Sequence, residues 1–260
     1  MKKSYLPFLI ILMTFTITCL SSAQLQEEEG LFQNISIKPG ISFEYFSRTI
    51  SWDENEHTSK LKSYFFTFNT EFEIPNGLSL ALIFGYSFTN YDELEFRELP
   101  ISIELGVGKI GGYLLGSEIR KSIVSNEDLE IDGQAQFFVY LGSKEEWEIP
   151  DLSVEGTIEG KSCWMRFSVG PVFTYKGFAP IYPYLYLGFN KLWGKFKMDQ
   201  TIQDLTGSED KKISGESSFS TSLGFNFVVT EALSFKAEGN FMPYKDGVDL
   251  GFMIKAMYSF

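Results

Sequence analysis

The sequence contains very little cysteine and histidine. Cys19, Cys163 and His57 are the only three such residues among 260. Cys19 lies in an N-terminal segment that we expect to be removed, so the remaining chain has no partner for an internal disulfide. A small disulfide-stapled secreted domain and a cysteine-rich zinc site are therefore excluded. We expect no metal site and no cofactor.

Long apolar runs are also absent after the N-terminus. There, Lys2 and Lys3 precede an apolar stretch that ends at Leu20, and the small residues Ser21-Ser22-Ala23 follow. This order is typical of a secretory signal peptide, and the stretch is short for a transmembrane helix, which needs ~20 residues. We predict a signal peptide over residues 1–23. A retained anchor and a lipid attached to Cys19 are the alternatives.

Basic residues are scarce as well. Lys and Arg total 22 against 34 Asp and Glu, and removal of the two N-terminal lysines leaves a net charge of −14. Proteins that bind nucleic acid need a basic surface. We therefore exclude nucleic acid as a partner.

No segment shows the 3.6-residue apolar periodicity of a helix, and a period of two prevails instead. In residues 78–88, Leu80, Leu82 and Phe84 share one face, while Ser79 and Ala81 share the other. Because side chains alternate across a strand, this pattern predicts strands with one apolar and one small or polar face. Asn76-Gly77 before this strand favours a tight hairpin, since both residues tolerate positive φ.

These strands predict one all-β domain over residues 34–260, preceded by a short periplasmic segment at 24–33. With both ends periplasmic, the number of strands must be even. We expect about twelve, or ten if the glycine-rich region 106–116 is misinterpreted. The expected strands lie at roughly 34–49, 60–74, 78–91, 99–108, 111–124, 132–143, 162–176, 180–198, 211–229, 232–244 and 248–260, with the weakest at 148–159.

The expected connections alternate between short and long. Short ones lie at 75–77, 109–112, 176–180 and 229–232, and longer acidic ones at 51–59, 91–98, 125–133 and 200–212. Short periplasmic turns and longer external loops are typical of an outer-membrane barrel.

The C-terminal residues carry a second signal. One face of the last predicted strand consists of Phe252, Ile254, Ala256, Tyr258 and Phe260. This strand resembles the C-terminal strand of Gram-negative outer-membrane β-barrels, and residues 34–260 loosely resemble a porin-like or general outer-membrane β-barrel domain. The resemblance implies that the barrel-assembly machinery reads residues 252–260. It also implies an outer-membrane location, among membrane lipid and lipopolysaccharide.

Two folds fit a period of two. A closed antiparallel transmembrane β-barrel turns its apolar face to lipid and leaves no strand edge unpaired, whereas a soluble β-sandwich buries that face. The signal peptide, the terminal aromatic residue, the dense aromatic residues and the alternating connections favour the transmembrane barrel.

Charged residues on the predicted inner face are the candidate functional residues. They are Lys38, Glu44, Glu71, Glu73, Glu104, Arg120, Arg166, Lys236, Glu238 and Lys255. Such residues either line a narrow aqueous channel or pair with one another and fill the barrel. Barrels of about eight strands are filled by side chains and those of sixteen to eighteen strands are open. Twelve strands lie between these sizes, so both arrangements are possible. A porin-like passive channel is our first hypothesis. A non-conducting structural or surface-interaction barrel that acts through its external loops is the second.

His57 raises a third hypothesis, an enzyme of the barrel rim that modifies lipid or cleaves protein. The histidine lies in an acidic predicted loop beside Asp53 and Glu54. A general base needs a positioned partner, and no second catalytic cluster accompanies it. We therefore expect a solvated histidine and no enzymatic activity. The acidic loops match no known metal-binding spacing.

Overall fold

The computed structural model describes residues 35–53, 57–148 and 156–259. They form one twelve-stranded antiparallel sheet, which confirms the predicted fold class and number of strands. No helix among these residues is long and apolar enough to cross a membrane. The strands are β1 (Ser36–Trp52), β2 (His57–Ile74), β3 (Leu78–Phe96), β4 (Ile103–Ser125), β5 (Leu129–Gly142), β6 (Glu145–Glu148), β7 (Gly156–Tyr175), β8 (Ile181–Ile202), β9 (Leu205–Gly215), β10 (Phe219–Val228), β11 (Leu233–Tyr244) and β12 (Gly247–Tyr258).

The sheet closes on itself where β12 pairs with β1, from Phe46 opposite Gly251 to Gly40 opposite Met257. The closed circuit of pairings passes through ten strands, β1-β2-β3-β4-β5-β7-β8-β10-β11-β12. The other two prolong neighbours in the ring. β6 continues the pairing of β5 along β7, and β9 continues that of β10 along β8. A barrel of ten strands is only slightly wider than one whose interior side chains fill it.

Three expected strand boundaries were wrong. The segments 99–108 and 111–124 form the single strand β4, so the predicted turn at 109–112 lies inside a strand. The segment 211–229 is divided between β9 and β10. The weak strand expected at 148–159 corresponds to the end of β6 and the start of β7, and residues 149–155 lie outside the described part.

One end of the barrel carries the short turns, at 75–77, 126–128, 176–180 and 229–232, together with the start of β1 and the end of β12. The connection at 126–128 was predicted as an external loop. It lies at this end because β4 is one strand rather than two. Asn76 and Gly77 have φ of 72° and 69°, which confirms the predicted tight hairpin. By the rule for short turns, this end is periplasmic.

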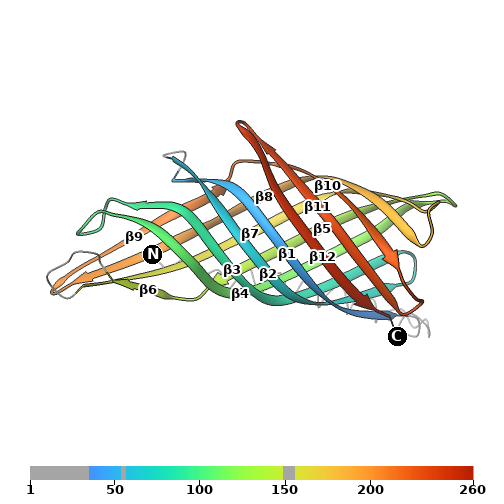
Figure 1. The fold of residues 1–260 in the computed structure, drawn as a ribbon, viewed down its shortest axis with the longest axis horizontal. Coiled ribbons are helices and arrows are strands. Elements are labelled where there is room, and N and C mark those ends of the chain that lie inside the picture. Colours follow the sequence, from blue (N-terminus) through green and yellow to red (C-terminus); the bar gives the residue numbers. More distant parts are fainter. Residues whose placement is uncertain (1–34, 54–56, 149–155, 260) are drawn as a thin grey trace, which may run out of the picture. The chain divides into compact units, whose positions relative to one another are not determined.

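At the opposite, external end the strands are prolonged rather than joined by long loops. β8 and β9 pair from Trp193 opposite Ser214 to Ile202 opposite Leu205, with a two-residue turn. We call residues 193–214 the β8–β9 extension. In Figure 1 this extension and the β3–β4 hairpin reach farther than the β11–β12 hairpin. The residues that sequence reasoning assigned to an acidic loop at 200–212 therefore belong mostly to paired strands.

Candidate functional site

The outer face of the barrel is apolar along the periplasmic part of the strands. On β1 to β4, the apolar side chains of Ile41, Phe66, Leu82, Phe84 and Tyr113 are more than half exposed. This apolar band continues over the other strands of the ring. The other large exposed apolar side chains of this band include Phe68, Ile119, Val169, Phe189, Phe219, Leu223, Phe225, Phe252 and Ile254. Soluble proteins rarely expose apolar patches above a few hundred Å². In lipid, by contrast, such a band is favourable and the closed ring leaves no free edge.

The chain has the fold of an outer-membrane β-barrel. No protein-family model matches it, and no curated protein does. Among solved structures it is similar to the β-domain of the Bordetella autotransporter BrkA, with 9% identity, a TM-score of 0.45 and coverage of 87% of this chain and 100% of the other. It is also similar to the outer membrane protease OmpT of Escherichia coli, with 9% identity, a TM-score of 0.41 and coverage of 86% and 94%. At such identities these are likenesses of fold alone.

The predicted inner charges lie in the barrel and form ion pairs. Lys38 contacts Glu73, Lys255 contacts Glu71 at 3.6 Å, and Lys236 contacts Glu238 at 3.2 Å. Arg120 lies 3.7 Å from Asp132. The side chain of Glu104, in β4, falls outside the described part. These inner charges are therefore paired with one another rather than free.

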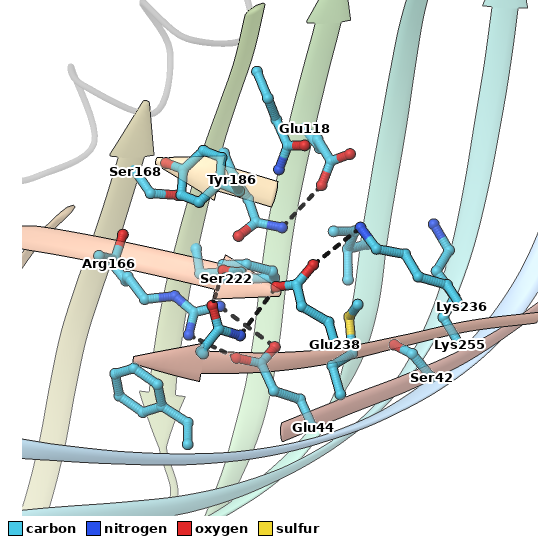
Figure 2. A pocket seen from close by; sticks show the side chains of 18 of the residues that line it. Ser42, Glu44, Glu118, Arg166, Ser168, Tyr186, Ser222, Lys236, Glu238 and Lys255 are labelled. Carbon is cyan, nitrogen blue, oxygen red and sulfur yellow. Dashed lines mark hydrogen bonds and ion pairs between the residues drawn. The ribbon is translucent and has the colours of Figure 1, made fainter. Parts of the chain in front are cut away.

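One of these pairs crosses the barrel. Arg166 on β7 contacts Glu44 on β1 through Nη1 at 2.7 Å, and β7 and β1 are not neighbours in the ring (Figure 2). The guanidinium also lies over the rings of Phe46 and Phe138, at 4.7 and 4.6 Å from their centroids. Both charged side chains are almost fully buried. Two aromatic faces and a carboxylate together satisfy the cation that burial would otherwise destabilise.

A second cluster lies beside this pair, towards β10 and β11. The Tyr184 hydroxyl donates to Glu238 at 2.6 Å, and Asn240 donates to the same carboxylate at 3.0 Å. Lys236 completes the set, and its ammonium lies 4.7 Å from the centre of the Tyr184 ring. The carboxylate is thereby held by three donors, as Figure 2 shows for the labelled lysine and glutamate. An added Cβ at Gly224 would collide with the Tyr184 ring, so glycine leaves room for the ring there.

Sequence reasoning missed Arg48, another buried cation. It is fully buried, and its guanidinium donates to Asn190 at 2.7 Å and to the carbonyl of Ser217. The signal was present, because Arg48 is an even number of residues from Lys38 and Glu44 in the same strand. Alternation alone places all three on the inner face.

On the external side of the Arg166–Glu44 pair, aromatic side chains cross the bore. Phe46 on β1 lies 6.1 Å from Trp164 on β7, and Phe65 on β2 lies 5.9 Å from Trp164 and 6.5 Å from Phe138 on β5. Tyr140 stacks on Trp164 at 5.3 Å. These contacts join opposite walls. We call these five residues the aromatic plug, and they are continuous with a larger buried apolar core that ends near Met198 and Ile213.

At the level of the aromatic plug, the inner face of the strands changes from polar to apolar and the outer face changes from apolar to polar. Along β2, Glu73, Glu71 and Thr67 face inward near the periplasmic end, whereas Phe65 and Leu61 face inward above them and are fully buried. The outward residues change in the opposite sense, from Phe66 and Phe68 to Lys60 and Lys62. β8 behaves in the same way, with Leu192 and Phe196 inside and Lys191 and Lys195 outside. The exchange marks the external edge of the lipid-facing band.

Cavities of two sizes lie in the interior of the described barrel. A small one of about 80 Å³ lies among Glu44, Arg166, Glu238 and Lys255. A larger one of about 580 Å³ is lined by Glu73, Arg120, Asp132 and Lys255 near the periplasmic turns. We call the larger cavity the periplasmic vestibule. It lies on the periplasmic side of the aromatic plug.

His57 is placed differently from the expectation. It begins β2, and its ring stacks on Trp52 at 6.5 Å between centroids. Its Nε2 is buried and has no hydrogen-bond partner among the described residues. The predicted solvated loop histidine is therefore a packed one, and residues 54–56 beside it lie outside the described part. Within the described chain, no group of three metal-binding side chains occurs.

The predicted assembly signal lies on the outer face of β12. Phe252, Ile254 and Tyr258 are between 43% and 47% exposed, and Ala256 is half-buried in the same row. Phe260 lies outside the described residues. The row belongs to the lipid-facing band next to the seam between β12 and β1.

Proposed function

We propose that this protein is a non-conducting, non-enzymatic outer-membrane barrel that acts through its external surface. The observation that carries the proposal is the aromatic plug. Trp164 has no exposed surface and contacts rings from β1, β2 and β5. Side chains from opposite walls thus meet in the bore, and the apolar core continues from there to the external end. Such an apolar layer opposes the passage of ions and hydrated solutes.

The external part of the sheet is the surface offered to partners. In the β8–β9 extension, alternate residues such as Met198 and Ile213 are buried inside, while Lys195, Lys197 and Lys212 are exposed. Its interior also anchors the β3–β4 connection, because Gln200 accepts a hydrogen bond from the backbone of Ile101 at 2.9 Å. A packed interior gives this region a fixed shape beyond the membrane, which suits a structural or surface-interaction role better than passive transport.

Conductance tests the proposal against the porin-like hypothesis. We expect the refolded wild-type protein to give no single-channel steps in a planar bilayer and no swelling of liposomes in small sugars. A variant with Phe46→Ala, Phe65→Ala and Trp164→Ala should admit ions, because it removes three rings that cross the bore. Circular dichroism and heat-dependent migration establish that each protein is folded. Reproducible conductance by the folded wild-type protein would overturn the proposal.

A further inference from the structure

The charges that line the periplasmic vestibule are divided between two opposite walls. Lys236 on β11 and Lys255 on β12 form one of them, which we call the basic wall. In the ring of ten strands, β4 is five steps from β11 and β5 is five steps from β12, so these strands face each other across the bore. The other wall carries the carboxylates that line the vestibule. We call it the acidic wall, and it consists of Glu71 and Glu73 on β2, Glu118 on β4, and Glu130 and Asp132 on β5.

The acidic wall keeps a surplus of negative charge. Two cations of the lining lie on the same side, Arg120, which is 3.7 Å from Asp132, and Lys176, which follows β7 at the periplasmic end. Neither Glu118 nor Glu130 forms an ion pair within the part of the chain that the structure describes. Carboxylates therefore outnumber cations on this side of the vestibule.

The basic wall keeps a surplus of positive charge. Lys236 lies 3.2 Å from Glu238, a residue of the same strand, and Lys255 lies 3.6 Å from Glu71 across β1. Lys38 on β1 adds a third ammonium group beside this wall. An ammonium group has three donors, so one ion pair leaves donors that a ligand can use.

The vestibule is a blind pocket. The aromatic plug lies on its external side, and its lining reaches Lys176 and Val228 beside the periplasmic turns. Its inner end adjoins the smaller cavity, because Glu118, Lys236 and Lys255 line both (Figure 2). A ligand therefore enters and leaves on the periplasmic side, and binding requires no passage through the bore.

Opposite surpluses on facing walls select for a ligand that carries both charges. A simple cation or anion would compensate one wall and leave the other without a partner, and a neutral solute would displace water from both walls without supplying a charge to either. The remainder of the lining is neutral and polar, with Ser79, Ser122, Thr174, Tyr182 and Asn226. Hydroxyl and amide groups of this kind donate to and accept from peptide groups.

We propose that the periplasmic vestibule binds a zwitterionic amino acid or short peptide. Its α-ammonium group lies against Glu118 and Glu130, and its α-carboxylate lies against Lys236 and Lys255, which gives charge-assisted hydrogen bonds at both ends. The volume of about 580 Å³ falls in the range of roughly 300–1,000 Å³ that is typical of small-molecule sites. This site is separate from the external surface and does not depend on the function proposed for that surface.

Calorimetric titration with dialanine, of folded protein in uncharged detergent micelles, tests the site. Wild-type protein should bind dialanine saturably, and high salt should weaken the binding. Glu118→Gln/Glu130→Gln should bind it roughly tenfold more weakly, because this is the least that a hydrogen bond to a charged group contributes. The control Glu146→Gln/Asp204→Asn removes the same charge from exposed external positions and should bind like wild type. Circular dichroism and heat-dependent migration establish that each variant is folded.

Changes to the ligand assign each of its ends to a wall. N-acetyldialanine lacks the ammonium group, so it should bind wild type roughly tenfold more weakly than dialanine does. It should bind Glu118→Gln/Glu130→Gln as well as dialanine binds that variant, because the partner of the missing group has gone. Dialaninamide lacks the carboxylate and should show the same relation to Lys255→Gln. Weakening of all three ligands by one common factor in a variant would indicate a structural effect and contradict the site.

Other solutes test the class of ligand. Absence of saturable binding of alanine, dialanine and trialanine to folded wild-type protein would overturn the proposal. Putrescine, acetate and maltose represent a cation, an anion and a neutral polar solute, and each should bind more weakly than dialanine. Equal binding of any one of them would overturn the assignment to a zwitterion.

Discussion

Arginine substitutions at two adjacent positions of β3 test which face of the barrel meets lipid. Leu82 is 51% exposed on the outer face, and Ala81 is 3% exposed on the inner face. Leu82 belongs to a row with Leu80 and Phe84, near the middle of the apolar band. An arginine at the bilayer midplane costs about 2–4 kcal/mol in a transmembrane barrel. Leu82→Arg should therefore lower the folding equilibrium constant in lipid by roughly 30- to 700-fold.

At the neighbouring position 81, an arginine would enter the polar interior instead of the lipid. Ala81 is paired across the sheet with Glu71 on β2 and Glu118 on β4. Both carboxylates border the periplasmic vestibule, which has a volume of about 580 Å³. Ala81→Arg places its guanidinium beside two carboxylates and a cavity that can receive it. We expect a cost of about 1 kcal/mol, at the low end for an enlarged interior side chain.

Equilibrium unfolding in urea of protein refolded into phosphatidylcholine vesicles, followed by tryptophan fluorescence, measures both free energies. A label on a single cysteine at position 82 should be quenched by quenchers carried on lipid, and one at position 81 should not, in a background with Cys163→Ser. Equal destabilisation by the two arginines, together with equal quenching at the two positions, would refute the register of β3 and the membrane assignment that depends on it.

Three other substitutions have definite expected outcomes. Arg166→Ala leaves Glu44 buried without its partner and should lower the free energy of unfolding by about 3–5 kcal/mol, while Arg166→Met with Glu44→Leu should recover most of it in the same urea titration. Gly77→Ala, at φ of 69°, should cost about 1 kcal/mol, and an unchanged midpoint would contradict the tight turn. His57→Ala should leave lipid-modifying and proteolytic assays at the wild-type level, since we expect no activity to lose; loss of either activity would support a rim enzyme.

The register of most strands was predictable because it depends on a local pattern. Alternation in residues 78–88 placed Leu82 outside and Ala81 inside, as the structure has them. Asn76-Gly77 fixed a hairpin through backbone conformation alone. β4 was divided wrongly because glycines at 106, 108, 111, 112 and 116 provide few side chains that alternate. Its continuity comes from pairing with β3, as in Tyr86 opposite Tyr113 and Tyr91 opposite Val107.

The partners within the site could not be predicted in the same way. Alternation indicates that Glu44 and Arg166 face inward, but they are 122 residues apart. Their contact depends on how many strands separate them around the ring and on the stagger of each pairing. Both quantities changed when β4 proved to be a single strand. The aromatic plug could not be predicted from the sequence for the same reason, because Phe46 and Trp164 come into contact only when the ring of strands closes.

The exchange of polarity along the strands resolves the choice between a lipid-facing barrel and a protein with an apolar interior. On the periplasmic side of the exchange, Phe68 faces lipid and Glu71 lies inside, so lipid solvates the apolar face and ion pairs lie in the bore. On the external side, Leu61 lies inside and Lys62 outside, as in a soluble protein. Burial of apolar surface from water stabilises only the second part, because lipid is as apolar as the protein interior. The external region should therefore gain stability from its own core, and the membrane-spanning part from its closed hydrogen-bonded ring. One continuous sheet joins the two, so strands such as β2 and β8 hold the external surface in a fixed orientation to the membrane.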